Sequence, residues 1–138
     1  MGEFISYATW LYLAEPLLFS LPRVKVREVE PWEEDGETWR RLGVTFPDTI
    51  ASHSTVQTYY FDSVTGLQRR MDYDVEVNGW AGVAHYTSEH KDFDGLVTPP
   101  RRRVLLRDNL LAGNHMTSRW VVETTGLLST QSKALLTE

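Results

Sequence analysis

The sequence LQRRMDYDVEV, residues 67–77, alternates between apolar and polar side chains over most of its length. One register contains the apolar side chains of Leu67, Met71, Tyr73, Val75 and Val77. The other register contains Gln68, Arg70, Asp72, Asp74 and Glu76. Because successive side chains of a strand point to opposite faces, this alternation predicts a β-strand with one buried and one wet face. The predicted strand is about twice the usual length of five or six residues, which is typical of a strongly curved sheet or a barrel wall.

Shorter alternating stretches lie on both sides of residues 67–77. They predict further strands from Val24 onward and over residues 38–46, 55–62, 80–91, 96–107 and 119–124. Turn-forming runs separate them, namely Glu33-Glu34-Asp35-Gly36, Ser63-Val64-Thr65-Gly66, Asn78-Gly79 and Asp94-Gly95. Asp-Gly is a favoured pair in tight hairpins. Gly82 and Pro99-Pro100 interrupt two stretches, so we expect a bend or bulge at Gly82 and an edge or bulge at the prolines.

The two ends of the chain have other patterns. Apolar side chains recur at spacings of three and four residues near the start, at Phe4, Tyr7, Ala8, Leu11, Ala14 and Leu18. This period predicts a helix over residues 3–15 that Pro16 ends, with one apolar face that must cover another apolar surface. Residues 129–138 predict a weak helix or a frayed tail.

These patterns together predict the fold class. We expect a mainly β protein with a single curved antiparallel sheet, a half-barrel or open barrel, and the N-terminal helix packed across it. A length of 138 residues suits one domain. Residues 1–138 are therefore predicted to form a single domain, with strands over about 24–107 and an irregular C-terminal segment over 108–138.

Composition excludes several classes of function. The formal net charge of −5 argues against a nucleic-acid partner, and the absence of cysteine excludes disulfides and thiolate metal sites. No apolar run is long enough to span a membrane. Residues 1–22 carry Glu3 where a signal peptide has positive charge, and they contain no small-residue cleavage site. We expect a cytoplasmic protein, with the cell envelope as the alternative if an N-terminal signal is missing from this sequence.

Three groups of arginines are the strongest candidates for ligand binding: Arg40-Arg41, Arg69-Arg70 and Arg101-Arg102-Arg103. Adjacent side chains of a strand point to opposite faces, so each group places at least one guanidinium on the inner face. Arg69 is in register with Met71 and Tyr73, and Arg40 is in register with Leu42. The triplet offers either Arg102 or the pair Arg101 and Arg103. An inward guanidinium needs an anionic partner, which is a ligand head group or a carboxylate of the protein itself.

A second candidate group surrounds His85. His85 and Tyr86, or His85 with Asp72 on the neighbouring strand, are weak candidates for proton transfer, and cross-strand pairing is their simpler role. His85 and His90 point to opposite faces, which makes a poor metal site, so no metal is expected. No nucleotide-binding, serine-hydrolase or zinc-protease motif occurs, and no cofactor is predicted.

Three stretches together resemble a known family of bacterial proteins. They are DGETWRRLGVTFP (residues 35–47), YYFDSVTGLQRRMDY (59–73) and DFDGLVTPPRRRV (92–104). The residues that form their turns and strand ends are similar to those of the bacterial lipoprotein-localisation carriers over about residues 32–107. The resemblance implies an unclosed antiparallel barrel with a helix across its mouth and hydrophobic cargo inside. More loosely, the alternation also resembles closed lipocalin-like barrels.

Three hypotheses follow for function. The first is a non-catalytic binding or carrier protein for an apolar small molecule or lipid, with or without an acidic group, and with Arg40, Arg69, Arg102 and Arg103 as candidate anchors. The wall of that site is predicted to contain Met71, Tyr73, Val75 and Trp80. The second is a small barrel enzyme, of the cyclase or isomerase kind, acting on an apolar metabolite. The third is an interaction module or homodimer without a ligand.

Overall fold

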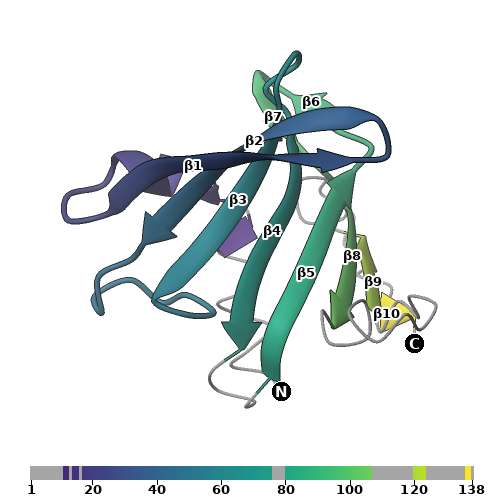
Figure 1. The fold of residues 1–138 in the computed structure, drawn as a ribbon. Helices are drawn as coiled ribbons and strands as arrows, with labels where there is room; N and C mark the ends of the chain where they lie inside the picture. The colour runs from purple at the N-terminus through teal and green to yellow at the C-terminus, as the bar shows by residue number, and fades with distance from the viewer. Residues whose placement is uncertain are drawn as a thin grey trace.

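The computed structural model describes residues 11–12, 14–15, 17–75, 80–106, 120–123 and 136–137. Within this part of the chain, the main element is one open antiparallel sheet with the strand order β1-β2-β3-β4-β5-β8-β9-β10 (Figure 1). Its strands are β1 (Lys25–Glu34), β2 (Glu37–Thr45), β3 (Val56–Asp62), β4 (Gln68–Val75), β5 (Trp80–Ser88), β8 (Arg101–Leu106), β9 (Trp120–Glu123) and β10 (Leu136–Thr137). A separate two-stranded sheet consists of β6 (Lys91–Phe93) and β7 (Leu96–Thr98).

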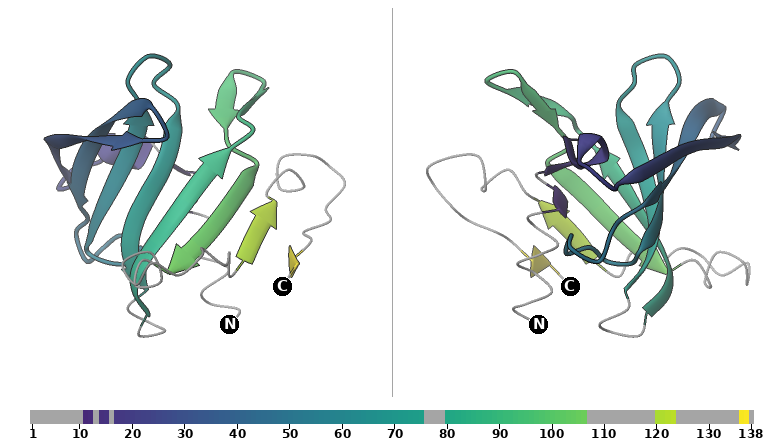
Figure 2. Two further views of the ribbon diagram at one scale, coloured as in Figure 1. Left: turned by 45° about the vertical axis from the view of Figure 1, so that its right-hand side comes forward. Right: turned by 90° about the vertical axis from the view of Figure 1, so that its left-hand side faces the viewer.

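The large sheet is curved, and its edges β1 and β10 do not meet (Figure 2). Every neighbouring pair of strands in it is antiparallel. The prediction of a mainly β protein with one large, open antiparallel sheet is therefore confirmed. In the described part of the chain, no helix is long and apolar enough to cross a membrane.

The β1–β2 hairpin ends in the predicted Asp35-Gly36 turn. Both residues have positive φ, +52° at Asp35 and +78° at Gly36, which is the signature of the type I′ turn that suits the twist of paired strands. The hairpin crosses the other strands near one end of the sheet, and its turn lies beside the end of β5 (Figure 1). The same geometry recurs at the predicted Asp94-Gly95 turn between β6 and β7.

A β-bulge changes the register of the strand that suggested the fold. Tyr60 pairs with Arg70 and Phe61 pairs with Gln68, so Arg69 is the extra residue on β4. The core face of β4 therefore carries Gln68, Met71 and Tyr73. The prediction that Arg69 shares a face with Met71 and Tyr73 is wrong, because uninterrupted alternation does not hold across a bulge.

The interruptions predicted near β5 and β8 are also present. Tyr73 pairs with Val83 and Val75 pairs with Trp80, so β5 has one extra residue at Ala81-Gly82, where Gly82 has a φ of +68°. The predicted strand over 96–107 is divided into β7 and β8 at Pro99-Pro100, because proline donates no ladder hydrogen bond. The predicted strand over 80–91 is likewise divided, into β5 and β6.

The ends of the chain differ from the predictions. The helix predicted over 3–15 is not supported as an element packed across the sheet. Residues 3–10 and 13 of it lie outside the described residues, Leu11, Tyr12 and Ala14 have helical backbone, and a 3-10 turn, η1 (Leu17–Ser20), follows. The predicted strand over 119–124 appears as β9. Leu136–Thr137 pair with β9 as a strand, whereas a helix or frayed tail was expected there.

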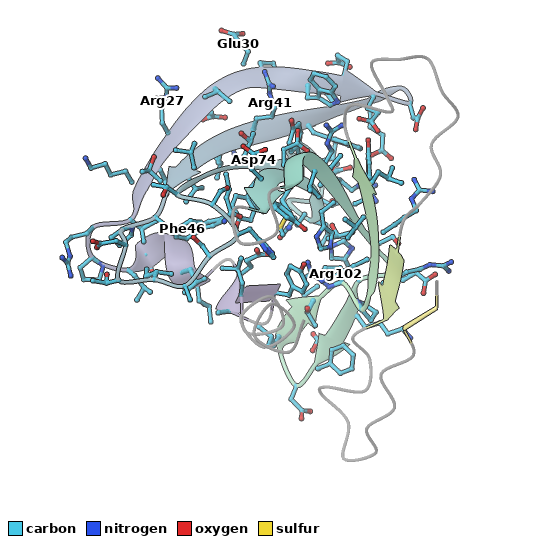
Figure 3. All side chains as sticks on the ribbon, turned by 90° about the horizontal axis from the view of Figure 1, so that it is seen from below. Arg27, Glu30, Arg41, Phe46, Asp74 and Arg102 are labelled. Atoms are coloured by element: carbon cyan, nitrogen blue, oxygen red, sulfur yellow. The ribbon has the colours of Figure 1, made fainter. Side chains whose placement is uncertain are left out.

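One face of the sheet holds the apolar core. Its buried side chains include Val44, Tyr59, Met71, Tyr73, Val83 and Val104, and they contact Leu11, Tyr12, Leu18 and Phe46. The described residues before β1 thus cover the core face. Figure 3 shows the side chain of Arg102 inside the curve of the strands, whereas Arg27 and Glu30 on β1 point away from it.

Candidate functional site

A pocket of about 170 Å³ lies at one end of the core face. Its apolar lining consists of Phe61, Leu67, Val97 and Pro99, with Gly66 between them. Its polar lining consists of Tyr12, Glu15, Gln68, His90 and Arg102. An apolar wall with a few convergent polar groups is the usual composition of a small-molecule site. We refer to these residues as the interior pocket.

Arg102 is the most buried cation of this pocket. It pairs with Thr87 across β5 and β8, which places its side chain on the core face beside Val104. The side chain is 1% exposed, and its guanidinium carbon lies 4.2 Å from the centre of the Tyr12 ring. Nη2 donates to the Tyr12 carbonyl oxygen at 3.3 Å. Nε and Nη1 have no hydrogen-bond acceptor among the described residues.

Glu15 is the acid that faces Arg102. Its Oε2 lies 3.9 Å from Arg102 Nη1, too far for a hydrogen bond, and its side chain is also 1% exposed. The Tyr59 hydroxyl lies 3.1 Å from Oε1 and also 3.1 Å from Gln57 Oε1, so it shares one proton between two acceptors, and Gln68 Nε2 donates to Oε2 at 3.4 Å. Burial raises the pKa of Glu15, and the nearby Arg102 charge offsets part of that rise. The carboxyl group of Glu15 and the guanidinium of Arg102 therefore lie close together without a direct hydrogen bond.

Two buried histidines lie deeper in the core. The Tyr73 hydroxyl is 3.0 Å from His85 Nδ1, and the ring of His53 stacks on Tyr73 with centroids 4.1 Å apart. Burial, together with the positive charge of Arg102, lowers the pKa of His53 to about 3 and lowers that of His85 well below its usual value. Both imidazoles are thus neutral at physiological pH, and neither lines the interior pocket.

A larger cleft of about 510 Å³ lies between the hairpin turn and the ends of β5 and β8, and we call it the hairpin cleft. It is lined by Glu34, Asp35, Glu37, Trp39, Arg69, Tyr86, Thr87, Ser88, Glu89, Arg101 and Arg103. Two of its arginines form ion pairs with carboxylates of the protein itself. Arg69 Nη2 lies 3.1 Å from Glu37 and 3.4 Å from Asp62, and Arg101 Nη1 lies 2.9 Å from Glu89.

Beside the hairpin cleft lies the face of β4 that was predicted to be exposed to solvent. Other residues of the protein cover it. Arg70 and Asp72 are buried there beneath Trp32 and the hairpin turn. The Tyr86 hydroxyl donates to Glu34 at 2.7 Å and accepts from Arg70 at 3.0 Å. Burial and the bond to Glu34 raise the pKa of Tyr86, so it is held as a neutral donor rather than as a base.

The structure separates the predicted ligand-binding residues. Arg102 lines the interior pocket, whereas Arg69 and Arg103 line the hairpin cleft. Arg40 is exposed and pairs with Glu28 at 2.8 Å. Met71 and Tyr73 lie in the packed core and line neither pocket. Val75 and Trp80 pair with each other in the sheet, but their side chains lie outside the described part of the structure.

The weak catalytic candidates are not brought together either. His85 pairs with Met71 and Val104 on the core face, whereas Tyr86 pairs with Arg70 on the opposite face. Asp72 lies on the face of Tyr86, since it pairs with Ala84 and its Oδ2 accepts from the Tyr60 hydroxyl. His85 therefore cannot act on one substrate together with Tyr86 or Asp72.

Sequence reasoning missed Glu15, the buried acid that faces Arg102. A signal for it existed, because Glu15 is the one charged residue between Phe4 and Pro22 in an otherwise largely apolar stretch. A lone charge on a segment that must cover an apolar core requires a partner or a proton. Gln68 was missed because the bulge at Arg69 turns it toward the core, and nothing in the alternation predicts that bulge.

Comparisons with known proteins add little to this geometry. No protein-family model and no curated protein matches the chain. Among solved structures, the chain is similar to the crystal structure of a DUF1329 family protein from Desulfovibrio piger, with 20% sequence identity and a TM-score of 0.47. The likeness covers 62% of this chain and 35% of that chain, so this chain spans about a third of that protein's length. A likeness at this level carries no inference about a ligand.

Proposed function

We propose that the protein binds a small carboxylic acid with an apolar body in the interior pocket. The observation that supports this proposal is the buried guanidinium of Arg102, which has two nitrogens without an acceptor among the described residues. A buried donor without a partner is costly, and a carboxylate matches the fork of a guanidinium. The apolar lining from Phe61, Leu67, Val97 and Pro99 suits the rest of the ligand.

The size of the pocket limits the ligand. The interior pocket is small, with a volume of about 170 Å³ against about 510 Å³ for the hairpin cleft. This favours a short-chain or single-ring acid over a long-chain lipid. Hexanoate is a suitable probe, and hexanol is its neutral counterpart with the same chain.

The experiment compares two neighbouring arginines. Calorimetric titration of hexanoate is expected to show binding to the wild type, and Arg102→Met is expected to weaken it about 10- to 150-fold, as for a lost charged hydrogen bond. Arg101→Met is the matched control, because Arg101 lies on the same strand but is exposed and faces Glu89. It is expected to leave the affinity unchanged.

A second measurement does not depend on the variant being folded. In the wild type, hexanoate is expected to shift the Nε–H resonance of Arg102 in a nitrogen-detected NMR spectrum, with Arg40 as the unshifted reference. Equal binding of hexanoate and hexanol, or unchanged affinity in Arg102→Met, would contradict the proposal. No binding of hexanoate at all would favour the interaction module without a ligand.

A further inference from the structure

The interior pocket already contains an acid beside its guanidinium. Glu15 and Arg102 are both about 1% exposed, yet their nearest N–O distance is 3.9 Å. The oxygens of Glu15 accept from Tyr59 and Gln68, which are neutral donors. Arg102 donates to a carbonyl oxygen of Tyr12. Each of the two side chains thus forms its hydrogen bonds with neutral groups. Nε and Nη1 of Arg102 remain available to a ligand anion.

A ligand carboxylate at Arg102 places two negative charges beside one positive charge. Like charges at close range raise the pKa of a carboxyl group, and burial acts in the same direction. In the free protein, burial already raises the pKa of Glu15 despite the opposing effect of Arg102. Neutralising Glu15 is therefore the least costly way to accommodate the second anion.

We propose that Glu15 takes up one proton from solvent when an acid binds at Arg102, so that affinity falls as pH rises. This inference rests on the proposed function. At a pH above the pKa of Glu15 in the free protein, the free state contains ionised Glu15 and Arg102, and the bound state contains protonated Glu15, Arg102 and the ligand anion. One proton enters for each ligand bound, and no covalent bond other than the O–H of Glu15 is formed. Glu15 is thereby the residue that makes the affinity for the ligand depend on pH.

Other titratable groups near Glu15 do not account for such an effect above about pH 6. Across the sheet, it faces Arg102 on β8 and Tyr59 on β3, and the pKa of Tyr59 is raised. His90 also lines the pocket, and burial lowers its pKa from the ordinary value of 6.5. His53 and His85 are neutral in this range. The carboxyl group of hexanoate, like other carboxyls, is ionised there.

The test measures proton uptake directly. Hexanoate is titrated calorimetrically into the full chain at several values between about pH 6 and pH 8, in two buffers with different ionisation enthalpies. Uptake is expected to rise with pH toward one proton per ligand, and affinity to fall by up to about tenfold per pH unit. Glu15→Gln is expected to bind hexanoate without uptake and with an affinity that does not depend on pH.

Glu89→Gln is the matched control. It removes the same charge from an exposed residue that pairs with Arg101, outside the interior pocket. Its uptake is expected to equal that of the wild type. NMR of carboxyl-labelled hexanoate on the wild type adds a readout that needs no variant, and the bound ligand is expected to keep the chemical shift of an ionised carboxylate.

The outcomes separate the two proposals. Hexanoate binding without proton uptake, uptake that persists in Glu15→Gln, or a protonated bound ligand would each overturn the role of Glu15 and leave the binding function intact. Failure of hexanoate to bind either the wild type or Glu15→Gln would overturn the proposed function and this inference together.

Discussion

Arg70 and Asp72, two residues apart on β4, form a two-point ion pair. Arg70 Nε donates to Asp72 Oδ1 at 2.6 Å, and Nη2 donates to Oδ2 at 2.9 Å. Both residues are buried, and Arg70 Nη1 also lies 3.1 Å from Glu34 near the hairpin turn. The guanidinium carbon is 4.9 Å from the centre of the Tyr60 ring. This pair therefore connects the β1–β2 hairpin to the middle of the sheet.

The first prediction concerns that pair. Arg70→Met is expected to lower the free energy of unfolding by about 3–5 kcal/mol, because it leaves the buried carboxylate of Asp72 without its cation. Urea denaturation measures the change. The double variant Arg70→Met/Asp72→Asn is expected to lose less than Arg70→Met alone.

Arg40→Met is the control for the Arg70 variant. The Arg40–Glu28 pair is exposed, so its loss is expected to leave the urea midpoint unchanged. Equal losses in Arg40→Met and Arg70→Met would show that burial of the Arg70 pair has no energetic consequence.

The second prediction concerns the hairpin turn. Gly36 has a φ of +78°, and Gly36→Ala is expected to cost about 1–2 kcal/mol of stability, because a Cβ atom is strained in this conformation. Gly43→Ala is the opposite case. Its φ is not in the left-handed region and its Cβ would meet atoms at ordinary distances of 3.7 and 3.8 Å. It is expected to stabilise the protein by about 0.4–1 kcal/mol. Thermal denaturation that ranks the two variants the other way would contradict the assigned turn.

The third prediction concerns pH and the buried histidines. The pKa of His53 is about 3 in the folded protein and 6.5 ordinarily, so the unfolded chain binds more protons between these values. Stability is therefore expected to be fully present above about pH 6.5 and to fall as pH decreases, by up to about 1.4 kcal/mol per pH unit for each histidine. His85 adds to this slope, because its pKa is also lowered.

Glu15 opposes the histidines. Its raised pKa means that the folded protein holds this proton more tightly, so its contribution to stability decreases as pH rises above about 4.5. Two histidines outweigh one carboxyl between about pH 4.5 and 6, and the net slope is positive there. Urea denaturation at several pH values measures it, and His85→Gln is expected to reduce the slope. A slope unchanged in His85→Gln would mean that His85 is not held neutral.

The fourth prediction concerns the packed core. Met71 is fully buried among the residues of the core face, so Met71→Ala is expected to cost about 2–5 kcal/mol. Val64→Ala is the control at a residue that is 91% exposed, and it is expected to change stability by less than about 0.5 kcal/mol. A small effect at Met71 would indicate a cavity wall there, as the sequence first suggested, instead of a packed interior.

Much of the fold follows from local chemistry. The Asp35-Gly36 and Asp94-Gly95 turns, the irregularity at Gly82 and the break at Pro99-Pro100 depend on the conformations that glycine, aspartate and proline allow. Alternation placed β2, β3 and β9 within one or two residues of their observed ends. Each of these features involves residues close together in the chain, so a single sequence contains the necessary information.

The candidate site depends on contacts that no local pattern contains. The bulge at Arg69 exchanges which side chain of β4 faces the core, because one extra residue reverses the register. The pairing of Thr87 with Arg102 decides that Arg102, and not Arg101 or Arg103, points inward.

Alone, the sequence determined a curved antiparallel sheet whose arginines required anionic partners, since strand periodicity and the cost of burying charge are local and general. The tertiary structure alone decided that Arg102 meets Glu15, 87 residues earlier in the chain, in an interior pocket at 3.9 Å. That contact exists because the segment before β1 folds back over the core face. The order of residues along the chain does not reveal which distant segments come into contact.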